Sequence, residues 1–200
     1  MSQTDLLSQP TPPLMPDGGH SAFLRWVART LLRTTGWKLV GTLPNVPKAV
    51  MIVAPHSSNW DGLWGFAAKI ALNFEVRVLG KAQLFWWPLG PVLKKLGAIP
   101  LDRSSPQGTI GQAVRLIKRS ERMWYVITPE GTRKRVEHWK NGFWKIARDA
   151  GVPIIPAYFD YPSKTIGLGE LFWPTEDLQA DMAAIRTWYR PWHGKNRDTL

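Results

Sequence analysis

The first clear pattern of apolar and polar residues lies between residues 21 and 35. At 100° per residue its larger apolar side chains gather on one arc: Phe23, Leu24, Val27, Leu31 and Leu32. A basic stripe recurs every four residues on the opposite side, with Trp26 at the boundary: Arg25, Arg29 and Arg33. The spacing predicts an amphipathic helix over residues 21–35.

Two interpretations of this helix stay open. A basic amphipathic helix with a tryptophan at its border is typical of segments that lie in a membrane interface. The same pattern is expected of a helix that covers the core and leaves its arginines in solvent. Periodicity alone does not separate the two, because both need one apolar side.

After Gly36 short apolar runs alternate with helical patterns. The runs predict strands at residues 38–43, 48–54, 75–79, 98–101, 123–128, 153–159 and 164–172. The helical patterns lie at residues 61–72, 88–96, 109–120, 142–150 and 176–189. This alternation predicts an α/β fold, in which a mixed, largely parallel sheet is flanked by helices and preceded by the amphipathic helix.

Residues 1–20 hold four prolines and two glycines with few apolar anchors, which predicts a flexible tail. Residues 21–200 are enough for a single domain with its own core. Cysteine is absent, which excludes disulfides and thiolate chemistry. We see no secretory signal in the first twenty residues, and the longest apolar run, residues 49–55, is far below membrane-spanning length. We therefore expect a cytoplasmic protein that reaches a membrane only by docking on it.

The chain carries a formal net charge of +11, and the excess is concentrated in its middle. Residues 81–148 contain 14 Lys or Arg and only four acidic residues. Such a segment favours an anionic partner: nucleic acid, anionic lipid or a phosphorylated ligand. Twelve tryptophans favour lipid, since this side chain suits sites with one apolar and one wet side. Aromatic rings also stack on bases, so nucleic acid stays open.

His56 and Asp61 are the first candidates for chemistry. They follow the apolar run of residues 48–54, and functional groups gather where the strands of α/β sheets end. Five positions along a helix is about 140°, so the two side chains meet only if His56 lies in the entry turn and Asp61 in the first helical turn. The carboxylate would then orient the imidazole as a base. On spacing alone, the more common case is a structural one, with a His at a strand end and an Asp that stabilises a helix N-terminus.

Three later segments also follow or form apolar runs. Residues 97–103 end in Arg103, whose guanidinium suits phosphate. Residues 128–133 contain Gly131, which permits a tight turn with converging N–H groups, followed by Thr132 and Arg133. Residues 152–157 predict a buried strand. Each segment alone is an ordinary turn or strand. The sequence has no G-x-S-x-G, Walker or G-x-G-x-x-G motif, and its other histidines lack metal-ligand spacing.

In this order, the four segments resemble the conserved blocks of the glycerol-3-phosphate and lysophosphatidate acyltransferase family. His56 and Asp61 match its first block, and residues 97–103 its second. Residues 129–133, Pro-Glu-Gly-Thr-Arg, match the third, and residues 152–156 the fourth. The resemblance covers about residues 38–160.

The resemblance implies acyl transfer from acyl-CoA or acyl-carrier protein to a hydroxyl of a lysophospholipid, in particular 1-acyl-sn-glycerol-3-phosphate. His56 would be the general base and Asp61 would orient it. The acceptor would be held by a set of later residues: Arg103, Glu130, Gly131, Thr132 and Arg133. No metal and no cofactor is expected beyond the acyl donor.

The resemblance also implies a peripheral protein at the cytoplasmic face of the cell membrane, with no nucleic-acid partner. The alternative from another class is a non-catalytic basic module that binds lipid or nucleic acid.

Overall fold

A single sheet forms the centre of the molecule in a computed structural model that describes residues 4–81, 85–88, 90, 91, 94, 97–101, 108–133, 136 and 138–196. Within this part of the chain, seven strands lie in the order β1-β7-β6-β2-β5-β3-β4. Their bounds are β1 (Lys38–Val40), β2 (Lys48–Ala54), β3 (Val76–Lys81), β4 (Ala98–Leu101), β5 (Met123–Ile127), β6 (Ile154–Asp160) and β7 (Thr165–Leu168). Only β6 and β7 pair antiparallel, and the other neighbouring pairs are parallel.

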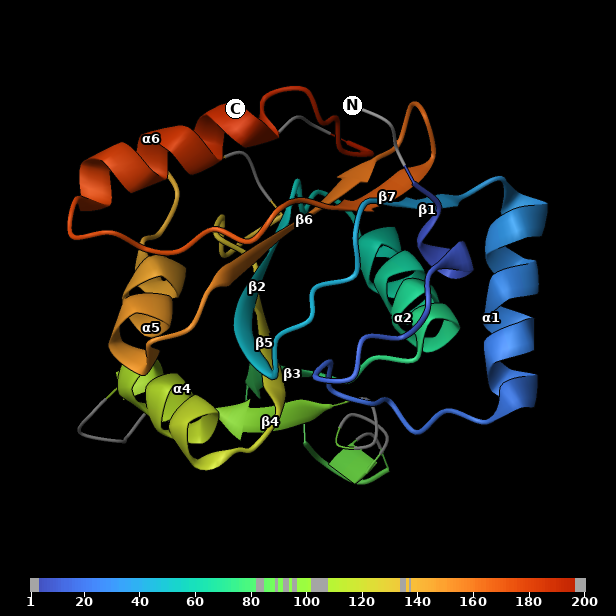
Figure 1. The fold of residues 1–200 in the computed structure, drawn as a ribbon, viewed down its shortest axis with the longest axis horizontal. Helices are drawn as coiled ribbons and strands as arrows, with labels where there is room; N and C mark the ends of the chain where they lie inside the picture. Colours follow the sequence, from blue (N-terminus) through green and yellow to red (C-terminus); the bar gives the residue numbers. More distant parts are fainter. Residues whose placement is uncertain are drawn as a thin grey trace.

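Helices cover both faces of this sheet (Figure 1). One face carries α1 (Ala22–Thr35) and α2 (Trp60–Leu72). The other carries α4 (Gly108–Arg119), α5 (Gly142–Ala150) and α6 (Leu178–Tyr189). The predicted α/β class, the largely parallel sheet and the N-terminal amphipathic helix are confirmed.

The central strands are apolar along their whole length because both of their faces are covered. In β2, Met51 packs toward α1 and α2, while Val50 and Ile52 pack toward α5. All seven residues of β6 are buried. Since β2 runs parallel to both β5 and β6, the carboxyl ends of these three strands lie at one edge of the sheet. The segments that follow them are thereby brought together.

Residues 4–20 pack against the domain, which differs from the flexible tail predicted by their composition. Leu6, in the short 3-10 helix η1 (Leu6–Ser8), and Met15 are both fully buried among residues of α1, α2 and the sheet. The Gln9 side chain donates to the Gly41 carbonyl and accepts from the Leu43 N–H. Two apolar anchors and a few hydrogen bonds are therefore enough to order a proline-rich segment.

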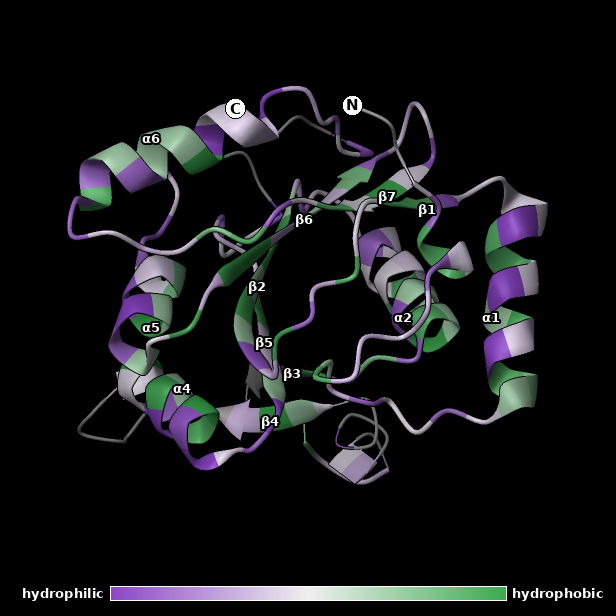
Figure 2. Ribbon diagram, in the orientation of Figure 1, coloured by the Kyte–Doolittle hydropathy of each residue, from purple (hydrophilic) through white to green (hydrophobic). Residues whose placement is uncertain are grey.

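Helix α1 begins at the Ser21 cap, whose hydroxyl accepts from the Leu24 N–H, and ends at Gly36 with φ of 81°. Polar and apolar segments alternate along it (Figure 2). It buries only a narrow strip, Ala28 and Leu32, while Phe23 is 72% and Trp26 is 61% exposed. The helix therefore covers the core with one strip and leaves most of its apolar arc in solvent.

Candidate active site

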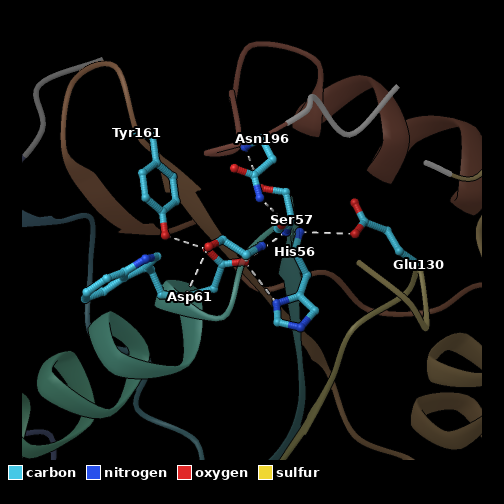
Figure 3. Close-up of polar contacts among 8 residues, drawn as sticks. His56, Ser57, Asp61, Glu130, Tyr161 and Asn196 are labelled. Atoms are coloured by element: carbon cyan, nitrogen blue, oxygen red, sulfur yellow. Dashed lines mark hydrogen bonds and ion pairs between the residues drawn. The ribbon is translucent and has the colours of Figure 1, made fainter. Parts of the chain in front are cut away.

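His56 and Asp61 meet at the carboxyl end of β2. His56 lies in the turn after the strand and Asp61 in the first turn of α2, as the sequence predicts for a contact at this spacing. Nδ1 of His56 is 3.1 Å from Oδ2 of Asp61 (Figure 3). The carboxylate accepts the Nδ1 proton, so in the neutral imidazole the lone pair lies on Nε2, the nitrogen that can act as a proton acceptor.

The Asp61 carboxylate is buried and fully engaged. Oδ2 also accepts the backbone N–H groups of Ser57 and Ser58 at 2.8 and 2.9 Å, and Oδ1 accepts the Tyr161 hydroxyl at 2.6 Å. Burial raises the pKa of the Asp61 carboxyl, but the hydrogen bonds from His56, Tyr161 and Ser58 outweigh it, so this pKa lies below its ordinary value. Asp61 is therefore charged at neutral pH and holds the imidazole in one orientation.

Glu130 joins the turn after β5 to the turn that carries His56. Its side chain is only 1% exposed, and Oε2 accepts the backbone N–H of His56 at 3.1 Å. β2 and β5 are parallel neighbours, which places these two turns side by side. The resemblance implies that Glu130 holds the acceptor, whereas this contact is with the backbone of the candidate base.

Gly131 supplies the sharp turn predicted for this segment. Its φ is +66°, and its N–H donates to the Thr128 carbonyl at 3.1 Å. The ammonium of Lys140 lies over it, since a Cβ added at Gly131 would be 3.0 Å from Nζ. Thr132 and Arg133 follow on the exposed side. The Lys140 ammonium thus lies over the turn whose Glu130 contacts the His56 backbone.

The other two segments of the resemblance, residues 97–103 and 152–156, contribute to strands at different positions in the sheet. Residues 154–156 begin β6, directly beside β2, and are fully buried. β4, which follows Gly97, is separated from β2 by β5 and β3. Gly97 has φ of +92° and no room for a side chain, because a Cβ there would be 2.2 Å from the Val76 carbonyl oxygen. Arg103 lies outside the described residues.

A cavity of about 730 Å³ adjoins His56 and Asp61. Gly131 and Lys140 line it beside the pair, and its apolar lining includes Val53, Phe66, Val76, Val78 and Val126. Its size lies in the range of small-molecule sites, about 300–1,000 Å³. The cavity thus combines a candidate base, His56, with the cationic side chains of Lys69 and Lys140 and a largely apolar lining.

In the part of the chain that the structure describes, no three His, Asp or Glu side chains converge as metal ligands would. The expectation that no cofactor is needed beyond the acyl donor stays a prediction.

Residues 39–160 match the family model described as Acyltransferase. The chain belongs to this acyltransferase family. The matched range contains His56, Asp61, Arg103 and Glu130. It also contains the strands β2 and β5, which position His56 and Glu130.

Three curated relatives of this chain are named 1-acyl-sn-glycerol-3-phosphate acyltransferase. The Escherichia coli protein is 34% identical over 126 residues, which cover 60% of this chain and 50% of the relative. The Streptococcus pneumoniae protein is 30% identical over 134 residues, 63% of this chain and 47% of the relative. The Bacillus subtilis protein is 29% identical over 140 residues, 68% of each chain. The chain thus spans about half the length of the first two relatives.

A solved structure of similar fold is the 1-acyl-sn-glycerophosphate acyltransferase of Thermotoga maritima. It superposes with a TM-score of 0.58 and 15% identity, covering 86% of this chain and 80% of the other. At this identity the likeness supports the fold alone.

Three residues near the pair in this member of the family were not singled out from the sequence: Lys140, Tyr161 and Asn196. Tyr161 follows the carboxyl end of β6, so the rule that functional groups gather at strand ends could have found it. Asn196 donates from Nδ2 to the Ser57 carbonyl at 2.9 Å, a contact across 139 positions that no local pattern indicates. Tyr161 and Asn196 both lie beyond the matched range.

Proposed function

We propose that the protein transfers an acyl group from a thioester, acyl-CoA or acyl-carrier protein, to the free hydroxyl of 1-acyl-sn-glycerol-3-phosphate. The observation that carries this proposal is the contact between His56 Nδ1 and Asp61 Oδ2 beside a largely apolar cavity. The names of the curated relatives support the choice of acceptor.

In the proposed reaction, Nε2 of His56 takes the proton of the acceptor hydroxyl, and the oxygen attacks the thioester carbonyl. A carbon–oxygen bond forms and the carbon–sulfur bond breaks. The imidazolium returns the proton to the leaving thiolate. Because the acceptor oxygen attacks the thioester directly, no acyl-enzyme forms. Asp61 keeps the ring oriented throughout and stabilises its transient positive charge. Holding thioester and hydroxyl together supplies much of the acceleration.

The acceptor phosphate is assigned to the turn after β5. Arg133, Thr132 and the adjoining Lys140 offer charge-assisted donors beside the cavity that His56 lines. The cations would hold the phosphate while the acyl chain lies in the apolar compartment. Arg103 stays a further candidate for this site.

His56→Ala tests the reaction directly. Purified protein is given labelled acyl-CoA or acyl-carrier protein together with 1-acyl-sn-glycerol-3-phosphate. Loss of a general base lowers the rate by about 10²–10⁴-fold, and His138→Ala, at an exposed position, serves as the control with wild-type rates. Unimpaired transfer by a folded His56→Ala protein contradicts the mechanism. Salt-sensitive binding of DNA without transfer from either thioester supports the non-catalytic alternative.

We further propose that the protein docks on the cytoplasmic face of the cell membrane through α1. Phe23, Trp26 and Val27 form an exposed apolar strip, with exposed fractions of 72%, 61% and 39%. Arg33, at the exposed end of the basic stripe, suits anionic headgroups. Among the described residues, no helix has both the length and the apolar character required to cross a bilayer.

A further inference from the structure

The second oxygen of the Asp61 carboxylate is held by a residue outside the matched family range. Tyr161 lies in the turn between β6 and β7, and its hydroxyl donates to Oδ1 of Asp61 at 2.6 Å (Figure 3). Oδ2 faces His56 and the backbone of the catalytic turn. Each oxygen therefore has its own donor, and the carboxylate cannot rotate without losing one of them.

The position of the Tyr161 hydroxyl is itself fixed. The backbone N–H of Tyr161 donates to the His193 carbonyl at 2.9 Å. The ring meets Trp37 edge to face, with centroids 5.1 Å apart and planes at 87°. Burial raises the pKa of Tyr161, and the hydrogen bond to Asp61 raises it further, so the phenol keeps its proton and remains a donor.

We propose that Tyr161 is a positioning residue for acyl transfer, which acts through Asp61 by fixing the carboxylate plane that orients His56. The inference rests on the proposed function of the His56–Asp61 pair. Tyr161 does not touch the reacting atoms. Its hydroxyl holds Asp61 from the side opposite to His56, so that the imidazole keeps Nε2 toward the acceptor.

Tyr161→Phe removes only the hydroxyl and keeps the ring against Trp37. We expect kcat to fall about tenfold, the effect of losing one hydrogen bond to a charged group. KM for both substrates stays within about twofold, because Tyr161 is assigned no substrate contact. The measurement is steady-state transfer across pH, together with thermal unfolding.

The pH profile separates positioning from a purely structural role. The hydroxyl is one of the donors that lower the pKa of Asp61, so without it the carboxylate takes up a proton at higher pH. With a more basic carboxylate beside it, the imidazole keeps an added proton more firmly, and the acid side of the activity profile therefore moves to higher pH in Tyr161→Phe.

Other charged groups near the pair are unchanged in this variant. Glu130 contacts the His56 backbone, and Lys69 and Lys140 line the same cavity. Lys195 lies over the Trp60 ring, 4.7 Å from its centroid. A shift of the acid side is thus assigned to the lost hydroxyl.

Tyr189→Phe is the matched control. The Tyr189 hydroxyl is buried and donates to the carbonyls of Ile52 and Ala157, away from Asp61. This change lowers the unfolding temperature and leaves the acid side of the activity profile at its wild-type pH. Unchanged kcat and pH profile in Tyr161→Phe, with His56→Ala inactive, overturn the inference about Tyr161 and leave the proposed function standing. Full activity of His56→Ala overturns the proposed function itself.

Discussion

At the scale of single residues, Asp61 organises the site. Its two oxygens accept from the His56 ring, from two backbone N–H groups and from the Tyr161 hydroxyl. Because the pKa of this carboxyl is lowered in the fold, its charged form stabilises the protein fully above the ordinary pKa of aspartate. That contribution is lost as pH falls through the lowered value. The turn that carries His56 is therefore well held at neutral pH and loosens only in acid.

Arg133→Ala tests the assignment of the acceptor phosphate. The change removes a charge-assisted donor from the turn after β5, so KM for 1-acyl-sn-glycerol-3-phosphate rises about ten- to a hundredfold. Acylation of a monoacylglycerol, which lacks the phosphate, changes little. Initial rates with the two acceptors give the comparison.

Arg119→Ala, at an exposed position on α4, is the control for nonspecific loss of charge. It should leave both acceptors unaffected. An equal loss with phosphorylated and unphosphorylated acceptors in Arg133→Ala would place Arg133 outside the phosphate site.

At the scale of elements, the sequence predicts most segments to within one or two residues. β2 and α5 have the predicted bounds, since a continuous apolar run and a Gly-to-Gly helical pattern mark them. β7 is shorter than predicted and ends at Leu168. Gly167 and Gly169 lie against the rings of Tyr158 and Trp188, and a Cβ on either glycine would clash. Such tertiary contacts are invisible to a local pattern.

Leu6→Ala tests whether residues 4–20 belong to the folded domain. Leu6 is 1% exposed and packs among core residues, so its truncation lowers the free energy of unfolding by about 2 kcal/mol, the lower end for buried leucine. Leu14→Ala, in the same segment but 43% exposed, changes it by less than about 0.5 kcal/mol. Denaturant unfolding measures both. Equal and small changes in the free energy of unfolding for both variants would support the flexible tail that the sequence predicts.

At the scale of the whole molecule, strand order and the outer contacts of the site could not be predicted. β1 pairs with β7, more than a hundred residues later, and β2 lies between β5 and β6. The contact between His56 and Asp61 could be predicted because their motif directly follows a strand. The contacts of Tyr161 and Asn196 depend on how distant segments pack. Local periodicity carries no information on such packing.

Trp26→Ala tests docking through α1. Burial of an aromatic side chain contributes about 1.5–3 kcal/mol, so affinity for vesicles of phosphatidylglycerol and phosphatidylethanolamine falls about tenfold or more. Added salt weakens binding further, because arginine and headgroup charges are screened. Transfer to a short-chain, water-soluble acceptor keeps its wild-type rate. Vesicle sedimentation and the soluble assay are measured on the same preparations.

Trp173→Ala is the matched control, since Trp173 is 59% exposed and lies outside α1. It should bind vesicles like the wild type. Equal binding by Trp26→Ala and the wild type would show that α1 is not the membrane contact.

The hydrogen bond from Asn196 to Ser57 affects when the site can form during synthesis of the chain. The turn that carries His56 leaves the ribosome before the residues that hold it, 161 and 196, the second of which lies 139 positions after Ser57. The strands of residues 48–127 can pair while synthesis continues, but the candidate base is not held in its final place until those later residues have emerged. In a nascent chain the proposed transfer chemistry would thus be complete only after residue 196 has emerged.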